Sequence, residues 1–177
     1  QNKVQKCINP NEYGSLLFDE KETNAVVNVM NARRIFRYSR TECAYANEFE
    51  EMINSKFGSK FCLGIVNGTA GLVTALQGIG IEQGDRVLVS SFTYISTALA
   101  VKLAGGVPVP LEIDLETGVD MADLEAELKK GCKAVIVTHL QGRCFDLSSL
   151  AKMLKEKNIF LIEDACQGFA AHCGGKY

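Results

Sequence analysis

The chain has 177 residues, of which 47% are hydrophobic and 23% are charged, a composition typical of a folded domain and not of a disordered segment. Its 19 basic and 21 acidic residues give a net charge of −2, without the positive excess that nucleic-acid binding requires. No apolar run reaches the roughly 20 residues of a membrane span, and the N-terminus lacks the apolar region of a signal peptide. We therefore expect a cytoplasmic protein with neither nucleic acid nor membrane as a partner.

The first 58 residues carry two patterns typical of helices. Acidic residues crowd the start of the segment 18–32, where the helix dipole favours negative charge. A second helix is expected from near Thr41 to Gly58, with Phe49, Met52, Ile53 and Phe57 on one face. The basic segment 33–40 between them is predicted to be a loop.

Short apolar runs rich in Val and Ile then alternate with segments of helical spacing. This alternation predicts an α/β fold, with a mainly parallel sheet and helices on both of its faces. Five runs are candidate strands: Phe61–Val66, Arg86–Ser90, Val107–Ile113, Cys132–His139 and Phe160–Ala165. Stripes that include Leu72 and Leu76, and Leu150 and Leu154, mark two of the helices.

Seven cysteines are spread along the chain without a CxxC pair, and there are only two histidines, His139 and His172. This spacing cannot assemble a zinc site, so we expect no metal and interpret the cysteines as reduced thiols. Both histidines are interpreted as structural.

Ligands of parallel α/β sheets gather where the strands end. One such place is NGTAG, residues 67–71, whose small residues at a helix start suit a phosphate group. Asn and Thr are also ordinary helix caps, so the motif alone leaves both interpretations open. It is neither a P-loop nor a dinucleotide fingerprint.

A second place is FLIEDACQ, residues 160–167, where an apolar strand runs into Glu163 and Asp164. These acids either cap the next turn or pair with a protonated heterocyclic nitrogen. A magnesium site of the Walker-B type would need a P-loop, which the chain lacks. In a third segment, SSFTYIS, the ring of Tyr94 either stacks on a flat ligand or packs in the core.

Together these segments resemble the DegT/StrS family of pyridoxal-phosphate (PLP)-dependent sugar aminotransferases, within the aspartate-aminotransferase superfamily of fold type I. The resemblance begins near residue 18, and RRIFRYS with EDACQ is most similar to the branch that aminates keto-inositols. The matching motifs follow in the family's order: FEEMINSKFG, VNGTAGLVTAL, GIGIEQGDRVLVSSFTYIS, GGVPVPLEIDLETGVD, KAVIVTHLQG and FLIEDACQGFAAHCGGKY.

The resemblance implies PLP as the cofactor, glutamate or glutamine as the amino donor, and a keto-sugar or keto-cyclitol as the acceptor. Asp164 would pair with the pyridinium nitrogen, Gln167 would hydrogen-bond the phenolic oxygen, and Tyr94 would stack on the ring. The phosphate would be bound by Gly68, Thr69 and Ala70, and Arg37 and Tyr38 would contact the substrate. The family also implies a homodimer when the protein is full length.

The resemblance further implies that the chain is the N-terminal part of such an enzyme. Residues 1–40 would form an arm, a helix and a substrate-side loop, and residues 41–177 would form part of the PLP-binding large domain. The family's Schiff-base lysine would lie beyond Tyr177, since Lys176 matches a turn, so no catalytic residue is expected in this chain and the chain alone should be inactive. Two alternatives remain: a binding or regulatory protein that retains the fold without catalysis, and a doubly wound nucleotide-binding domain.

Overall fold

The computed structural model describes residues 17–33, 35 and 45–174 of the chain. The chain divides into two compact units, residues 1–64 and 65–177, and each is described by itself. No helix in the described part of the chain has the length and apolarity that crossing a bilayer requires.

The first unit contains the two predicted helices, α1 (Glu20–Ala32) and α2 (Tyr45–Phe57). A capping box starts α1: Asp19 accepts a hydrogen bond from the backbone of Lys21, and Glu22 accepts one from the backbone of Asp19. The predicted start of the second helix, near Thr41, lies outside the described residues. Of its predicted apolar face, Phe49 and Met52 are exposed.

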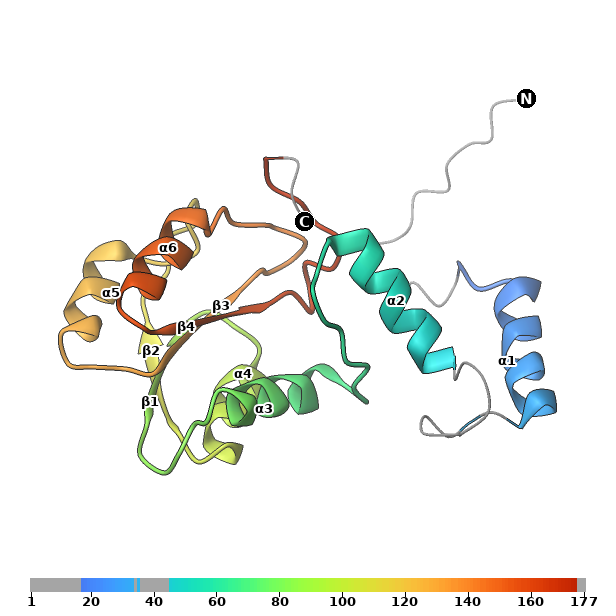
Figure 1. Ribbon diagram of the computed structural model, residues 1–177. Coiled ribbons are helices and arrows are strands. Elements are labelled where there is room, and N and C mark those ends of the chain that lie inside the picture. Colours follow the sequence, from blue (N-terminus) through green and yellow to red (C-terminus); the bar gives the residue numbers. More distant parts are fainter. Residues whose placement is uncertain (1–16, 34, 36–44, 175–177) are drawn as a thin grey trace. The chain divides into compact units, whose positions relative to one another are not determined.

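The second unit is built on a four-stranded, fully parallel sheet (Figure 1). Its elements follow one another along the chain as strand and helix in alternation, which confirms the predicted α/β fold. They are α3 (Gly68–Gly78), β1 (Arg86–Ser90), α4 (Ile95–Leu103), β2 (Val107–Leu111), α5 (Met121–Leu128), β3 (Ala134–Thr138), α6 (Ser148–Glu156) and β4 (Phe160–Asp164).

One predicted strand is wrong. The segment Phe61–Val66 forms no strand, although its apolar residues have the composition of one. A strand exists only where a neighbouring strand completes its hydrogen-bonded ladder. In the described residues the ladders connect only the four strands β1, β2, β3 and β4 with one another. Phe61 and Val66 are accordingly exposed.

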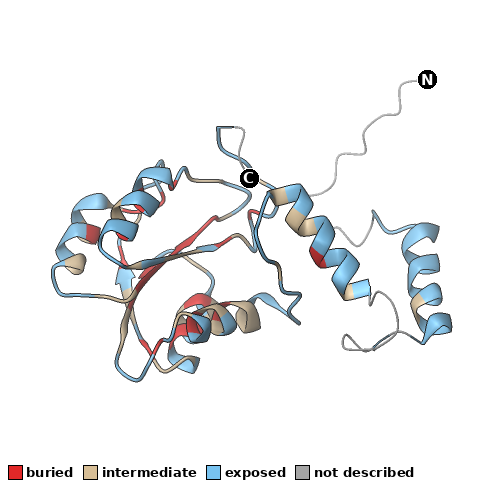
Figure 2. Ribbon diagram, in the orientation of Figure 1, coloured by how far each residue is buried: buried red, intermediate tan, exposed pale blue. Residues whose placement is uncertain are grey.

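Helices cover both faces of the sheet, as predicted. Val87, Val89 and Ile136 face α3 and α4, whereas Leu88 and Val135 face α5 and α6, because successive residues of a strand point to opposite faces. Figure 2 shows the buried residues concentrated along the strands and on the helix surfaces turned toward them. The predicted helix stripes are part of these two cores: Leu72, Leu76, Leu150 and Leu154 are all buried.

The strand order β2-β1-β3-β4 places the reversal of winding between β1 and β3. From β1 the chain runs to β2 on one side of it, and from β2 it crosses to β3 on the other side of β1. The segments that follow β1 and β3 therefore lead away from each other. In open parallel sheets, the carboxyl ends of the strands on either side of such a reversal form the ligand-binding crevice. Here those ends carry Ser90 and Thr138.

Candidate functional site

A cavity of about 310 Å³ lies at this edge of the sheet. Its volume falls at the lower end of the range for small-molecule sites, about 300–1,000 Å³. The lining residues come from α3, the start of α4, β3 and the end of β4: Gly68, Thr69, Tyr94, Ser96, Thr138, Asp164, Cys166 and Gln167. The structure thus brings together every predicted cofactor residue except Ala70.

The N-terminus of α3 forms one wall of the cavity. Asn67 is its N-cap, and the side-chain oxygen Oδ1 accepts a hydrogen bond of 2.8 Å from the backbone N–H of Ala70. This bond occupies the Ala70 N–H, and Ala70 does not line the cavity. Because the first N–H groups of a helix have no partner within it, Gly68 and Thr69 supply the backbone donors that an anion would use.

Gly68 lies against Cys166, and a Cβ atom added to it would come within 2.7 Å of Cys166 Sγ. We therefore expect Gly68→Ala to displace Cys166 and to weaken binding of PLP about tenfold or more, measured by fluorescence titration. Gly71 is the matched control in the same helix, because a Cβ there would meet nothing within 4 Å. Gly71→Ala should leave the affinity unchanged and raise helix stability by about 0.5–1 kcal/mol. Equal affinities of the two variants for PLP would contradict the inference that the cavity needs a residue without a side chain at position 68.

Asp164 forms the buried end of the cavity, with 6% of its surface exposed. The hydroxyl of Thr97 donates to Asp164 Oδ2 over 3.1 Å, and the backbone N–H of Cys166 donates to Oδ1 over 3.2 Å. A hydrogen bond from the Cys166 thiol to this carboxylate, together with burial, raises the pKa of Cys166 to about 11. The thiol is therefore protonated at neutral pH, and the Asp164 carboxyl group accepts from three donors: the Thr97 hydroxyl, the Cys166 N–H and the Cys166 thiol.

Gln167 follows Asp164 by one turn. Its side-chain oxygen Oε1 accepts a hydrogen bond of 3.2 Å from the backbone N–H of Gln141. A second bond, from Gly142 N–H to the Gln167 carbonyl at 2.8 Å, fixes the same turn. Because the amide oxygen is occupied by the protein, the amide NH₂ group is the part of the side chain left to donate to a ligand.

Tyr94 occupies the N-cap position of α4, but its side chain makes no capping hydrogen bond. The residue is 65% exposed, so the ring is not part of either hydrophobic core. This exposure argues against the packing interpretation of Tyr94. An aromatic ring that lines a cavity with an open face is suited to stacking on a planar ligand.

Neither histidine lines the cavity. His139 is buried, with Nδ1 accepting from the Phe145 N–H at 3.2 Å and Nε2 3.0 Å from Glu163 Oε2, which agrees with a structural role. His172 does not line the cavity. Arg37, Tyr38 and Lys176 lie outside the described residues, so their predicted roles stay predictions.

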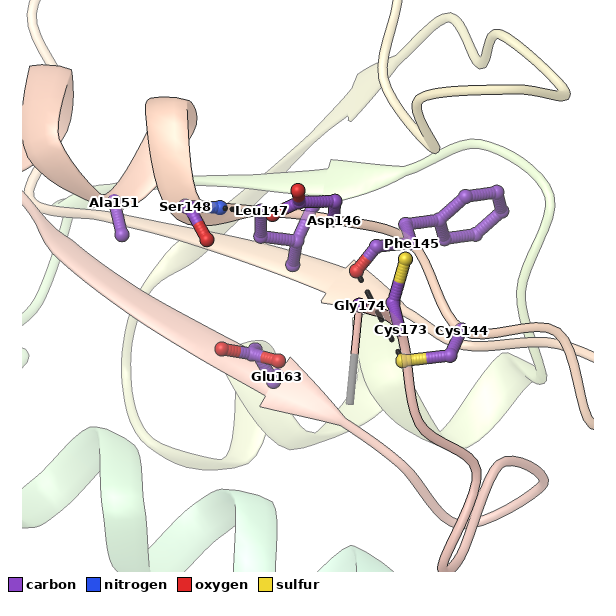
Figure 3. Close-up of a pocket in the computed structure, with 9 residues that line it drawn as sticks. All are labelled: Cys144, Phe145, Asp146, Leu147, Ser148, Ala151, Glu163, Cys173 and Gly174. Atoms are coloured by element: carbon purple, nitrogen blue, oxygen red, sulfur yellow. Dashed lines mark hydrogen bonds between the residues drawn. The ribbon is translucent and has the colours of Figure 1, made fainter. Parts of the chain in front are cut away.

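A second cavity, of about 350 Å³, lies beside Glu163 on the other face of β4 (Figure 3). Its lining comes from the segment before α6, the start of α6 and the segment around Cys173. Asp146 accepts a hydrogen bond from the backbone of Ser148, and Cys144 Sγ lies 3.9 Å from the Phe145 carbonyl, so these groups bond within the wall. We assign the functional site to the smaller cavity because it alone of the two combines a buried carboxylate with a helix N-terminus.

Four residues of the site had no role predicted from the sequence. Ser96, Thr138 and Cys166 line the cavity, and Thr97 donates a hydrogen bond to Asp164. Cys166 lies within the EDACQ motif, and Thr138 ends a strand, so their positions at the sheet edge could have been inferred from the sequence. Thr97 gives no such signal, because it lies in the first turn of a largely apolar helix and reaches Asp164 only through the fold.

The fold and the cavity define an α/β protein with a small-molecule site at the carboxyl ends of its strands. The chain matches the DegT/DnrJ/EryC1/StrS aminotransferase family over residues 17–177 and belongs to that family. This membership confirms the resemblance drawn from the motifs, and with it pyridoxal phosphate as the family's cofactor.

Three known proteins illustrate the similarity. The dTDP-3-amino-3,6-dideoxy-alpha-D-galactopyranose transaminase of Aneurinibacillus thermoaerophilus is 35% identical over 73% of this chain and 36% of its own length. A pleiotropic regulatory protein of Geobacillus stearothermophilus is also 35% identical, over 75% of this chain and 36% of its own. The solved aminotransferase of Psychrobacter cryohalolentis is 28% identical, with a TM-score of 0.82 over 90% of this chain and 40% of that structure. The chain thus spans little more than a third of the curated relatives.

Proposed function

We propose that this chain is the N-terminal part of a PLP-dependent aminotransferase that transfers an amino group from glutamate or glutamine to a keto-sugar or keto-cyclitol. Residues 1–40 would form its arm and substrate-side loop, and residues 41–177 part of its PLP-binding domain. The observation that carries the proposal is the cavity itself, where a buried carboxylate, a helix N-terminus and an exposed aromatic ring meet. The family and the sugar transaminase among its relatives support the substrate class.

The donor set of the cavity fits PLP. Gly68 and Thr69 at the start of α3 would hold the phosphate, with the Thr69 hydroxyl and the helix dipole favouring its negative charge. Asp164 would accept a hydrogen bond from the protonated ring nitrogen, and the Gln167 amide would donate to the phenolic oxygen. Ala70 would contribute only through its position in the same turn, because its N–H already donates to Asn67.

Bound PLP supplies an electron sink for the carbanion that forms when a proton leaves the substrate carbon. The residues of this chain would bind and orient the cofactor for that chemistry. Tyr94 would cover one face of the ring and keep water from it. Asp164 would keep the ring nitrogen protonated: an ion pair at about 4 Å and an effective dielectric constant near 20 contributes about 4 kcal/mol.

A ligand of the native state raises thermal stability, so binding can be tested by melting the purified chain with PLP and, separately, with ATP. At about 100 times the dissociation constant, PLP should contribute about 2.7 kcal/mol and raise the Tm by several degrees. ATP should leave the Tm unchanged. A shift with ATP and none with PLP would support the nucleotide-binding alternative, and no shift with either would contradict the proposed site.

The alternative function is that of a regulatory protein that retains the fold without catalysis. The similarity to a pleiotropic regulatory protein is the observation that favours it. Binding of PLP does not separate the two functions. Transfer of ¹⁵N from labelled glutamate or glutamine to a keto-sugar by the full-length protein does, and its absence would favour the regulatory role. The family further implies a homodimer with a site shared between subunits, which remains a prediction for the full-length protein.

A further inference from the structure

Three threonine hydroxyls are linked by hydrogen bonds in a row that ends at the Asp164 carboxylate, called here the hydroxyl chain. Thr138 Oγ1 at the end of β3 lies 2.8 Å from Thr93 Oγ1, in the loop after β1. Thr93 Oγ1 lies 2.9 Å from Thr97 Oγ1, in the first turn of α4, and Thr97 donates to Asp164 Oδ2. Thr97 is 0% exposed and Thr138 4% exposed, so these hydroxyls depend on each other for hydrogen bonds.

The carboxylate fixes the donor and acceptor of every hydrogen bond in the hydroxyl chain. An ionised carboxylate only accepts, so the single proton of the Thr97 hydroxyl must point at Asp164. Thr97 Oγ1 then accepts from Thr93, whose own proton is used in that bond, and Thr93 in turn accepts from Thr138. All three hydroxyl dipoles therefore point toward the negative charge, and bonds aligned in this way strengthen one another in a buried environment.

The hydroxyl chain also fixes the orientation of the carboxylate. One oxygen of Asp164 is held by Thr97 and the other by the backbone N–H of Cys166, so the group has a donor on each side. Asp164 lines the cavity, so these donors hold its carboxylate at the cavity wall. The Cys166 thiol faces the same carboxylate from the following turn, whereas Glu163, next on the strand, bonds to His139 on the opposite face.

We propose that Thr97 is a positioning residue: its hydroxyl, aligned by Thr93 and Thr138, keeps the Asp164 carboxylate turned toward the cavity. The consequence for PLP rests on the proposed function, since Asp164 can pair with the ring nitrogen only while its carboxylate is turned toward the cavity. The effect on the carboxyl group does not rest on that function, because it is a property of the four side chains alone.

The test compares Thr97→Val, which keeps the shape but lacks the hydroxyl, with Thr97→Ser, which keeps the hydroxyl. The readout is the ¹³C chemical shift of the Asp164 carboxyl carbon at neutral pH, measured by NMR in the 177-residue chain without added PLP. Loss of the hydrogen bond to Asp164 Oδ2 should move this signal in Thr97→Val, whereas Thr97→Ser should keep the parent chemical shift. An unchanged chemical shift in Thr97→Val, or equal changes in the two variants, would overturn the proposal.

Two further measurements complete the test. If Thr97→Val does not fold, Thr93→Val removes the next hydroxyl of the hydroxyl chain and should still move the Asp164 carboxyl signal, by a smaller amount; an unmoved signal would count against the hydroxyl chain. PLP titration of the folded variants should show an affinity about tenfold lower for Thr97→Val and near the parent value for Thr97→Ser. A parent protein that does not bind PLP would contradict the proposed function, while the carboxyl chemical shift would still decide the role of Thr97.

Discussion

Replacing Asp164 with Asn should lower amino transfer by the full-length protein about a thousandfold while PLP stays bound. The amide of Asn cannot carry the negative charge that holds a ring nitrogen protonated, and the loss of an ion pair worth about 4 kcal/mol corresponds to about three decades in rate. Thr69, Tyr94 and Gln167 would still contact the cofactor, so its affinity should fall far less than the rate. Single-turnover kinetics with glutamate, together with a PLP titration of the same preparation, measures both quantities.

Glu163→Gln is the matched control for this prediction. Glu163 is the neighbouring carboxylate on β4, but it bonds to His139 on the opposite face of the sheet and does not line the PLP cavity. Its neutralisation should leave the rate of transfer within a few-fold of the parent. Near-normal turnover in Asp164→Asn, or a similar loss in both variants, would refute the assignment of Asp164 to the ring nitrogen.

The predicted cofactor residues could be placed at one edge of the sheet from the sequence because their motifs lie at strand ends. Parallel strands bring their carboxyl ends to one edge, so Asp164 and Tyr94 could be placed near each other without any knowledge of distances. The strands themselves were recognisable because Val87–Val89 and Ala134–Val137 are buried on both faces and therefore apolar throughout.

Other features depend on contacts that no local pattern records. Phe61–Val66 has the composition of a strand, but whether it forms one depends on a neighbouring strand and not on its own residues. Thr97 looks like any helix residue, and its bond to Asp164 joins positions 67 residues apart. The occupied N–H of Ala70 depends on the rotamer of Asn67, which is likewise invisible in the sequence.

The 177-residue chain by itself should bind PLP without a covalent bond and should not catalyse amino transfer. In the described part of the chain, no lysine lines the cavity, and the resemblance to the family places the Schiff-base lysine after Tyr177. In the full-length protein that amine would form the covalent link to the cofactor and act as the positioned base that moves the proton. Positioning of this kind contributes about 7–11 kcal/mol, so the rate should be lower than that of the full-length protein by at least about 10⁵-fold.

Borohydride reduction of the chain with PLP, followed by peptide mass spectrometry, measures the covalent link directly. We expect scattered substoichiometric labelling of surface lysines such as Lys60 and Lys102, in contrast to one fully labelled lysine in the full-length protein treated in the same way. The comparison separates a missing amine from a misfolded cavity, because a cavity that has folded still binds PLP reversibly and raises the Tm of the chain. A single stoichiometrically labelled lysine in the 177-residue chain, together with turnover of a keto-sugar, would show that the catalytic amine lies within these residues and that its predicted position is wrong.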